Sequence, residues 1–242
     1  MKPLLYLLPN LLGDQEDHAP VLPHSVDSAV SQLDGIIAEN EKQARRFLRR
    51  FAFTPPKTFR EITIHLLNEH TTPAERELLI DQMKPGQKWG LVSDCGMPCL
   101  ADPGSELVLR ARERGVEIKA LVGPSSIFLA LVLSGLGGQR FFFRGYLPRD
   151  EALLIKEIKA LELQSKQEKL VQLFIETPYR NEKMFTYLLA HLNGKTWVSL
   201  ATDLTLPTET VVTHRVEQWK KMQPPALDKR PTVFCVKAEF IS

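Results

Sequence analysis

The segment "KWGLVSDCGMPCLADPGSELVLRARERGVEIKALVG" (residues 88–123) contains a strand, a loop, a helix and a second strand. Residues 88–94 are expected to form a strand that includes the apolar run Leu91-Val92, residues 103–115 have helical periodicity, and residues 116–123 again have a strand pattern. A connection through a helix joins parallel strands. The segment therefore predicts a parallel sheet, with an irregular loop (residues 91–104) at the carboxyl end of its first strand.

The same alternation of strand and helix patterns runs along most of the chain and predicts an α/β fold with helices on both faces of the sheet. The pattern changes near residues 118–124, where a strongly apolar helix and a Phe-rich strand follow. We expect an N-terminal α/β domain with a mostly parallel sheet (residues 1–120) and a C-terminal α/β domain with a mixed sheet (residues 121–242). Residues 40–51 are expected to form a helix with an apolar stripe made of Ala44, Phe47, Leu48 and Phe51.

Two helix starts are expected from capping residues. Ser25 is expected to be the N-cap of the helix that follows the first strand. Thr72 is expected to cap a later helix, with Pro73 at the first helical position and Glu75 completing a capping box.

The composition is that of an ordinary globular protein, with 43% hydrophobic and 25% charged residues among 242. A net charge of +2 is too small to indicate a nucleic-acid-binding protein by itself. The odd number of cysteines (Cys95, Cys99 and Cys235) favours a reducing compartment over a disulfide framework. The apolar run at residues 4–8 is interrupted by Pro9, so we expect no signal peptide. The sequence thus predicts a cytoplasmic protein without a membrane span or a metal site.

Common nucleotide-binding and nucleophile motifs are absent from the sequence, which has no GxxxxGK[ST] and no GxSxG. The stretch "SGLGGQR" departs from GxGxxG because Arg140 holds the place of the third glycine. A cofactor held by a phosphate-cradling loop is therefore disfavoured. A cofactor that carries an adenosine and an amino acid remains compatible with the sequence.

Three informative loops follow predicted strands: "PNLLGD" (residues 9–14), residues 93–104 and "VGPSS" (residues 122–126). The carboxyl ends of parallel strands lie at one edge of a sheet, and ligands of such sheets bind there. We therefore expect a small-molecule site at this edge.

Each candidate in these loops has a structural alternative. Asp94 is suited to bind a hydroxyl or ammonium group, or to form an Asx-turn. Asp102 is suited to bind a ligand, or to cap a helix that begins at Pro103. Gly96 permits a positive φ or a close backbone approach. Residues 123–126 offer free amides and hydroxyls for a carboxylate, or ordinary helix capping.

Several motifs resemble, in order and spacing, those of the tetrapyrrole methylase family: "LVSDCGMPCLADPG", "VGPSS", "SGL", "RFFFRGYLPR", "FIETPYR" and "ATDLTLPTET". They are most similar to the branch that methylates ribose 2′-hydroxyls in small-subunit ribosomal RNA. The resemblance covers nearly the whole chain. It implies two α/β domains, S-adenosylmethionine (SAM) in a cofactor cleft between them, and a homodimer. The implied partners are SAM, S-adenosylhomocysteine (SAH), and ribosomal RNA or the small ribosomal subunit.

The branch usually reads "SDAGTP…SDPG", and this chain departs from it by having Cys95 and Met97 in place of Ala and Thr. The positions that match are Asp94, Gly96, Pro98, Asp102, Pro103 and Gly104. The resemblance implies SAM contacts from the residues Pro9, Asp94, Cys95, Gly96, Met97, Leu100, Asp102, Gly123, Pro124, Ser125, Thr177 and Leu204. The expected substrate-binding residues are Glu39, Arg46, Arg49, Arg180 and Asp203.

Departures from the family concentrate on loops that face the substrate. The branch motif "TPIGN" is replaced by "LPNLLGD", and "AEDTR" appears as residues 38–42, where only Glu39 of its charged residues is kept in place. The motif "RELTK" appears as residues 202–206, where Leu206 replaces the Lys.

A cation-rich helix is the one local feature that favours RNA. Arg45, Arg46, Arg49 and Arg50 are expected on the side away from much of the apolar stripe, either tracking phosphates or as a solvated face. A ribose hydroxyl would also benefit from a base. The candidate bases are the carboxylates Glu39, Asp94, Glu176 and Asp203, for which ion pairs or helix caps are the alternative.

Three functions follow in order of preference. The first is a SAM-dependent methyltransferase acting on RNA, at the ribose 2′-oxygen of ribosomal RNA. The second is a methyltransferase acting on a tetrapyrrole or another small molecule. The third is a relative that binds SAM without catalysis.

Overall fold

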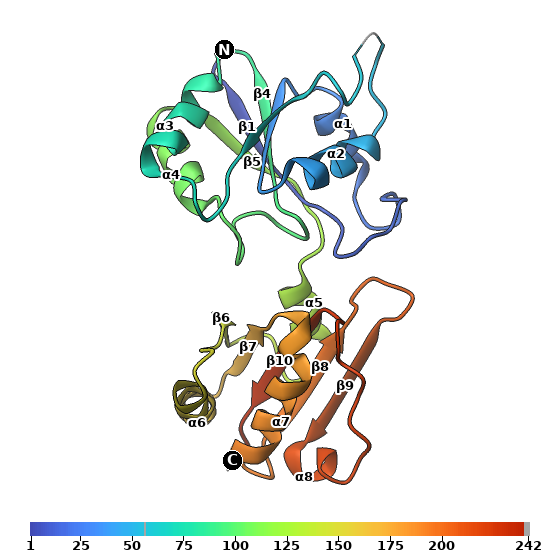
Figure 1. Ribbon diagram of the computed structural model, residues 1–242, viewed down its shortest axis with the longest axis vertical. Helices are drawn as coiled ribbons and strands as arrows, with labels where there is room; N and C mark the ends of the chain where they lie inside the picture. The colour runs from blue at the N-terminus through green and yellow to red at the C-terminus, as the bar shows by residue number, and fades with distance from the viewer. Residues whose placement is uncertain (56, 240–242) are drawn as a thin grey trace. The chain divides into compact units, whose positions relative to one another are not determined.

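The computed structural model describes residues 1–55 and 57–239 (Figure 1). The chain divides into two compact units, Met1–Ser125 and Ser126–Ser242, which we call the first and second unit. Each unit contains one five-stranded sheet and the helices that cover it. The loop at residues 121–125 therefore belongs to the first unit.

The sheet of the first unit is parallel throughout, as the sequence predicted, in the order β3-β2-β4-β1-β5. Its strands are β1 (Leu4–Leu8), β2 (Gly35–Ala38), β3 (Thr63–Leu66), β4 (Lys88–Val92) and β5 (Glu117–Ala120). Val92 pairs in register with both Leu8 and Ala38. Because the last residues of β1, β2 and β4 are level, the loops that follow these strands begin side by side.

Helices cover both faces of this sheet (Figure 1). They are α1 (His24–Val30), α2 (Glu41–Arg49), α3 (Pro73–Gln82) and α4 (Ser105–Glu113). The core on one face includes residues of α1 and α2, and the core on the other face includes residues of α3 and α4. The apolar stripe expected on α2 is confirmed, since Ala44, Phe47, Leu48 and Phe51 are all buried.

The helix starts were predicted with mixed success. The capping box of Thr72 and Glu75 is present at the start of α3, as expected. The cap expected at Ser25 is wrong, because α1 begins at His24 and its N-cap is Pro23. A proline before a helix already has the extended conformation that an N-cap needs, so the chain enters the helix without a side-chain cap.

The second unit has a mixed sheet in the order β6-β7-β10-β8-β9, as expected. The β6–β7 pair is parallel and the remaining pairs are antiparallel. Its strands are β6 (Phe141–Tyr146), β7 (Val171–Ile175), β8 (Trp197–Thr202), β9 (Thr210–Arg215) and β10 (Thr232–Lys237). Its helices are α5 (Ser126–Leu133), α6 (Glu151–Glu168), α7 (Asn181–His191) and α8 (Val216–Trp219), with a short 3-10 turn at Pro178–Arg180.

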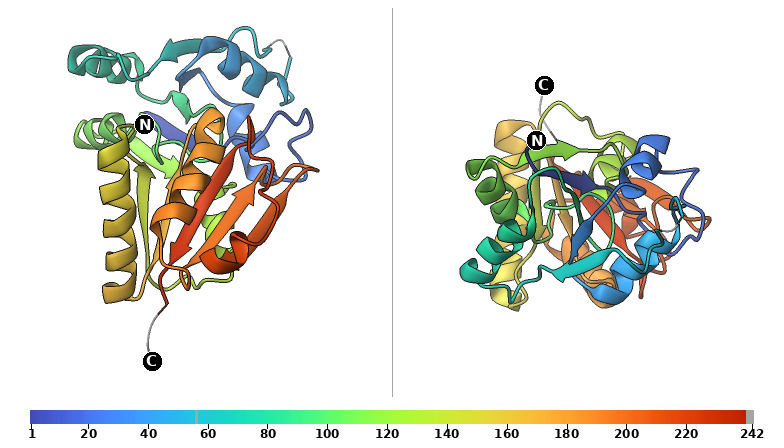
Figure 2. Two further views of the ribbon diagram at one scale, coloured as in Figure 1. Left: turned by 60° about the horizontal axis from the view of Figure 1, so that its bottom comes forward. Right: turned by 90° about the horizontal axis from the view of Figure 1, so that it is seen from above.

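The core of the second unit lies between its sheet and helices α6, α7 and α8, where Phe174 and Phe234 stack with their ring centroids 5.1 Å apart. In Figure 2, α6 and α7 run along the sheet of this unit. Ser134, just after α5, accepts a hydrogen bond from Thr213 of β9 at its main-chain oxygen. This contact ties the segment after α5 to the edge strand of the sheet.

Candidate active site

Asn10 joins two of the loops at the carboxyl edge of the first sheet. Its side-chain nitrogen donates to the main-chain oxygens of Ser93 (3.0 Å) and Asp94 (2.9 Å), and its main-chain N–H donates to the oxygen of Gly96 (2.8 Å). Asn10 is buried, so these bonds are shielded from water. The loop after β1 and the loop after β4 therefore form one structure.

The loop after β4 is built from tight turns. Gly96 (φ +69°), Cys99 (φ +67°), Ala101 (φ +68°) and Gly104 (φ +135°) all have positive φ. Two of these residues carry side chains, for which this conformation is unfavourable. The loop therefore keeps its shape at some conformational cost, which is common where the chain approaches a ligand.

The same loop corrects one expectation about Asp102. Helix α4 begins at Ser105, its N-cap is Gly104, and no side chain caps it. A cap by Asp102 with Pro103 at the first helical position is therefore wrong. The two turns at Ala101 and Gly104 carry the chain past Pro103 before the helix starts, which leaves the Asp102 carboxyl group available for other contacts.

Three carboxyl groups come together here: Glu39 after β2, Asp94 after β4, and Asp102 before α4. Hydrogen bonding to Ser93 lowers the pKa of both Glu39 and Asp102, and hydrogen bonding to the main chain of Asp94 also lowers that of Glu39, but burial outweighs these effects. Burial, followed by the charges of Asp102 and Asp94, raises the pKa of Glu39 to about 7. Burial also raises the pKa of Asp94 and of Asp102. We call Glu39, Asp94 and Asp102 the acidic cluster.

No cation of the described chain is among the groups that shift the pKa values of the acidic cluster. In addition, Oε1 of Glu39 is fully buried and has no hydrogen-bond partner among residues 1–55 and 57–239. Within the same residues, no group of three or more His, Cys, Asp or Glu has an arrangement able to hold a metal ion. The cluster is therefore suited to a positively charged organic group.

The third loop, at residues 123–125, contacts both of the others. A Cβ atom added to Gly123 would lie 2.0 Å from Cβ of Pro9, so only glycine fits there. A Cβ atom added to Gly96 would lie 3.6 Å from the main-chain oxygen of Pro124. Ser125 is buried, and its hydroxyl oxygen has no partner within the described residues. Pro9, Gly96 and residues 123–125 thus meet at one edge, as the sequence predicted from the strand ends.

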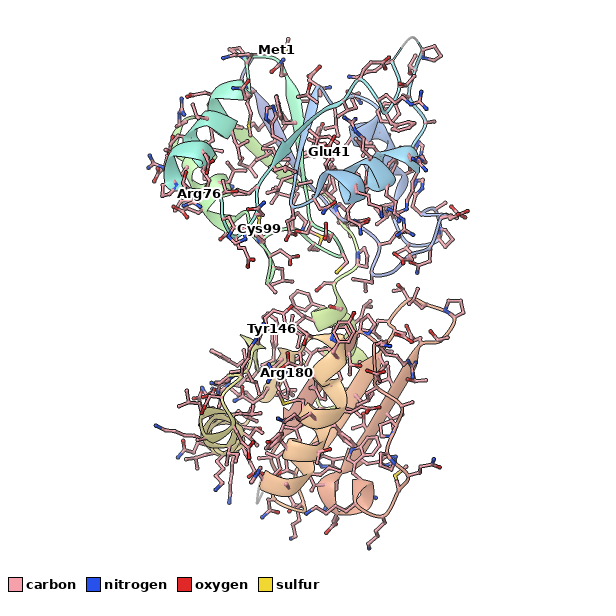
Figure 3. All side chains as sticks on the ribbon, viewed as in Figure 1. Met1, Glu41, Arg76, Cys99, Tyr146 and Arg180 are labelled. Atoms are coloured by element: carbon pink, nitrogen blue, oxygen red, sulfur yellow. The ribbon has the colours of Figure 1, made fainter. Side chains whose placement is uncertain are left out.

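The remaining predicted SAM residues of the first unit lie on the same loop as Asp94 and Asp102. Cys95 is exposed, whereas Met97 and Leu100 are partly exposed. Figure 3 shows the side chains of this loop, with Cys99 labelled. The loop therefore presents a mixed surface of sulfur, apolar and carboxylate groups.

The arginines of α2 do not form the uniform cationic face that the sequence suggested. Arg45 donates to the main-chain oxygens of Phe59 and Ile62 (both 3.0 Å), so its charge serves to hold the segment before β3. Arg50 is half-buried and donates to Asn10 Oδ1 (3.3 Å), and burial lowers its pKa. The helix is close enough to neighbouring loops for these long side chains to fold back onto carbonyl oxygens.

Two arginines remain on the outer surface. Arg46 forms an ion pair with Asp14 of the first loop (2.6 Å), and Arg49 is exposed with its guanidinium 5.7 Å from the ring centre of Phe59. A pocket of about 90 Å³ lies beside this ion pair. Its lining consists of Asn10, Leu12, Gly13, Asp14, Gln43, Arg46, Arg50, Asp94 and Cys95.

The predicted residues of the second unit lie in two ion-paired groups. Glu176 is buried, accepts a hydrogen bond from the main chain of Thr177 (2.7 Å), and pairs with Arg180 (3.2 Å). Figure 3 labels Arg180 in this unit. The main chain of Thr177 and the guanidinium of Arg180 therefore hold this carboxylate in place.

The second group is centred on Asp203, which has a φ of +52°. Its Oδ2 accepts hydrogen bonds from Arg230 (2.8 Å) and from the hydroxyl of Thr208 (2.8 Å), and Arg230 also donates to the main-chain oxygen of Thr208. Leu204, the next residue, is buried. Arg230 and Thr208 therefore fix the loop that carries both predicted residues.

Sequence reasoning missed Asn10 and Arg230. Asn10 had a weak signal, since it follows a buried strand directly and opens one of the three loops. Arg230 had none, because its partner Asp203 lies 27 residues earlier in the chain.

Comparisons with known proteins give a consistent family. The model of the tetrapyrrole (corrin/porphyrin) methylases matches residues 26–219. The "Ribosomal RNA small subunit methyltransferase I" of Vibrio cholerae is 31% identical over 209 residues, covering 86% of this chain and 67% of the relative. The protein of the same name from Bacillus subtilis is 29% identical over 209 residues, covering 86% and 66%. The chain thus spans about two-thirds of the length of these relatives.

Solved structures share the fold at low sequence identity. A diphthine synthase has a TM-score of 0.63 at 17% identity, covering 99% of this chain and 91% of that one. The methyltransferase CobJ has a TM-score of 0.61 at 15% identity, covering 98% and 94%. The fold, the matched residues and the identity to relatives agree: the chain belongs to the tetrapyrrole (corrin/porphyrin) methylase family.

Proposed function

We propose that this chain is a SAM-dependent methyltransferase that acts on small-subunit ribosomal RNA, at a ribose 2′-hydroxyl. The observation that carries the proposal is its 31% identity, over 86% of the chain, to a relative named for methylation of that RNA. The matched family region, residues 26–219, includes the acidic cluster and the loops at residues 93–104 and 123–125.

The residues at the carboxyl edge of the first sheet fit SAM. SAM has a sulfonium and an amino group, both of which suit the carboxyl groups of the acidic cluster. The buried Oε1 of Glu39 and the hydroxyl of Ser125 are polar atoms without partners in the described chain. The glycines at positions 96 and 123 bring the main chain close to this edge. The residues proposed to hold SAM are Pro9, Asp94, Cys95, Gly96, Met97, Leu100, Asp102, Gly123, Pro124, Ser125, Thr177 and Leu204.

SAM, when bound, supplies a methyl group on a positively charged sulfur that leaves as a neutral thioether. The chain's own contribution is to hold donor and acceptor in line and to accept the proton of the hydroxyl. Of the four carboxylates expected as bases, Glu176 and Asp203 are each paired with an arginine. Glu39 and Asp94 are therefore the carboxylates that we propose for accepting the proton.

We propose that RNA is recognised through Arg46, Arg49 and Arg180, together with Glu39 and Asp203. Arg49 has an exposed guanidinium, and Arg46 lies at the surface in an ion pair with Asp14. These two positive charges are suited to bind RNA phosphates. Because Arg45 and Arg50 are held by main-chain and Asn10 oxygens, we expect them to contribute mainly to structure.

A small-molecule acceptor is less well supported. The solved structures of other methyltransferases and of diphthine synthase share 17% identity or less with this chain. Their similarity therefore supports only the fold. A relative that binds SAM without catalysis is suggested by the Leu at position 206, where the family motif has Lys, and by the altered first loop, where "LPNLLGD" replaces "TPIGN". Transfer of a labelled methyl group decides between these functions.

We further propose that the protein is a homodimer in the cytoplasm. Exposed apolar side chains of the second unit, including Phe128, Val132 and Phe142, offer surface for a second copy. Among the residues that the structure describes, no helix has the length and apolar character needed to cross a bilayer. Sedimentation velocity at several concentrations tests the dimer.

The experiment that tests the activity is methyl transfer from labelled SAM to small ribosomal subunits that lack the modification. We expect label in the RNA, recovered after nuclease digestion as a 2′-O-methylated nucleoside. Label at a base, or label only in small-molecule acceptors, would overturn the proposed substrate. Absence of transfer to any acceptor, with SAM still bound, would favour the non-catalytic function.

A further inference from the structure

Glu39 has one carboxylate oxygen that the described chain leaves without a partner. Hydrogen bonding to the main chain of Asp94 and to Ser93 lowers the pKa of this carboxyl group, but burial has the larger, opposite effect. Its Oε1 is nevertheless fully buried and has no hydrogen-bond partner. Burial of a polar atom without a partner is unfavourable, so this atom indicates a ligand group that the chain itself does not supply.

The charged groups that act on Glu39 are both acids. Asp94, in the turn after β4, and Asp102, in the loop before α4, add their charges to the effect of burial. No Lys, Arg or His of the described residues is among the groups that shift the pKa of Glu39, Asp94 or Asp102. Since the pKa of Glu39 is raised to about 7, it is close to half protonated at neutral pH.

We propose that Glu39 is a specificity-determining residue that distinguishes SAM from SAH, by releasing its proton when SAM binds and retaining it when SAH binds. This inference rests on the proposed function. The two ligands share their adenosine and amino-acid groups and differ at sulfur, which is a sulfonium in SAM and a neutral thioether in SAH. A positive charge near a carboxyl group favours its ionised form, whereas a thioether does not.

The proposal has a consequence for turnover. On binding of SAM, the O–H bond of the Glu39 carboxyl group breaks, and the proton passes to solvent. Methyl transfer leaves the sulfur neutral and releases the proton of the ribose hydroxyl, and Glu39 is protonated again. The attraction that held the charged donor is then absent, so the product leaves more readily than the donor.

The test is calorimetric titration of the full chain with SAM and with SAH, at pH 6, 7 and 8, in two buffers of different ionisation enthalpy. The dependence of the observed heat on the buffer gives the number of protons released. The amino group of each ligand also exchanges protons, so the difference between the wild type and Glu39→Gln is the quantity of interest. We expect the wild type to release about half a proton more than Glu39→Gln with SAM at pH 7, and almost none more at pH 8.

The affinities give a second readout. At pH 8, where Glu39 is mostly ionised, the ratio of SAM to SAH affinity is expected to fall by about tenfold or more in Glu39→Gln. Glu41→Gln is the matched control, because Glu41 lies two residues further on, is exposed, and is outside the acidic cluster. We expect this variant to keep the wild-type proton release and affinity ratio.

A further variant covers the case in which Glu39→Gln does not fold. Asp102→Asn removes a charge that raises the pKa of Glu39, so the proton release is expected to shift to lower pH. Three results would each overturn the proposal. They are equal proton release by the wild type and Glu39→Gln, an unchanged ratio of SAM to SAH affinity in Glu39→Gln, and an unchanged pH dependence of proton release in Asp102→Asn. A wild type that binds neither ligand would overturn the proposed function instead.

Discussion

The side-chain nitrogen of Asn10 lies 3.0 Å from the main-chain oxygen of Ser93 and 2.9 Å from that of Asp94, and it thereby fastens the loop after β1 to the loop after β4. A buried amide with two such acceptors sets the position of both loops at once. The proposed SAM site depends on this bond pattern as much as on the residues that would touch SAM.

Replacing Asn10 by Ala is expected to weaken SAM binding and to lower the free energy of unfolding by about 1–3 kcal/mol. The reason is that two main-chain oxygens lose their donor, that of Ser93 in a buried bond and that of Asp94 in a partly buried one. Calorimetry with SAM and urea unfolding measure the two effects. Asn68→Ala, in a turn near the end of β3, is the control and should leave SAM affinity unchanged. Wild-type SAM affinity in Asn10→Ala would show that the two loops keep their positions without this side chain.

Replacing Gly123 by Ala is expected to displace the third loop, because the new Cβ atom would lie 2.0 Å from Cβ of Pro9. We expect a loss of stability of about 1–3 kcal/mol, together with weaker SAM binding. Gly138→Ala is a matched control, since nothing lies within 4 Å of the added atom there. If both variants bind SAM equally well, the contact of Gly123 with Pro9 has no part in the site.

Replacing Arg230 by Ala leaves the buried carboxylate of Asp203 without its cation. Arg230 is partly exposed, so we expect a loss of about 2 kcal/mol, below the full cost of breaking a buried pair. Urea unfolding measures this loss, and Lys221→Ala, at an exposed position, is the control. Adding Asp203→Asn to Arg230→Ala should cost little more. If the double variant is about 2 kcal/mol less stable than Arg230→Ala alone, the broken ion pair is not the cause of the loss in Arg230→Ala.

Replacing Arg46 and Arg49 together by Glu is expected to weaken RNA binding and to reduce its dependence on salt. Each lost phosphate contact lowers the slope of log affinity against log salt by about 1. Filter binding of ribosomal RNA over a range of salt concentrations measures the slope. Arg112→Glu, at an exposed position of α4, controls for net charge. An RNA affinity at low salt equal to that of the wild type would exclude this face from RNA binding.

The raised pKa of Glu39 also predicts how stability changes with pH. Between the ordinary pKa of 4.5 and about 7, the folded chain holds a proton that the unfolded chain has lost. Stability contributed by this group is therefore complete below pH 4.5 and falls as the pH rises towards 7. Glu39→Gln, which stays neutral, should gain stability relative to the wild type from pH 5 to pH 8. Because Glu39 is only half-buried, we expect a gain on the order of 1 kcal/mol.

Urea unfolding at several pH values, with Glu41→Gln as the control, measures this difference. A constant difference in stability between the wild type and Glu39→Gln across this range would mean that Glu39 titrates alike in the folded and unfolded chain.

Local patterns were sufficient to predict much of the fold. The apolar stripe of α2 and the capping box at Thr72 were predicted because each depends on residues within a few positions of one another. The parallel sheet followed from the strand–helix–strand order, and with it the edge at which the loops gather. The helix starts after Ser25 and Asp102 were wrong because Pro23 and the turns at residues 101–104 set the chain direction instead.

The sequence by itself determined the order of strands and helices, the family, and the loops that gather at one edge of the first sheet. Only the tertiary structure decided which polar and charged groups are paired and which pKa values are shifted. Asn10 meets Asp94 across 84 residues, and Asp203 meets Arg230 across 27. The pKa of Glu39 is raised to about 7 by burial and by two acids from other segments. Ionisation and pairing depend on which groups are near in space, and distances between remote residues are fixed only when the whole unit packs.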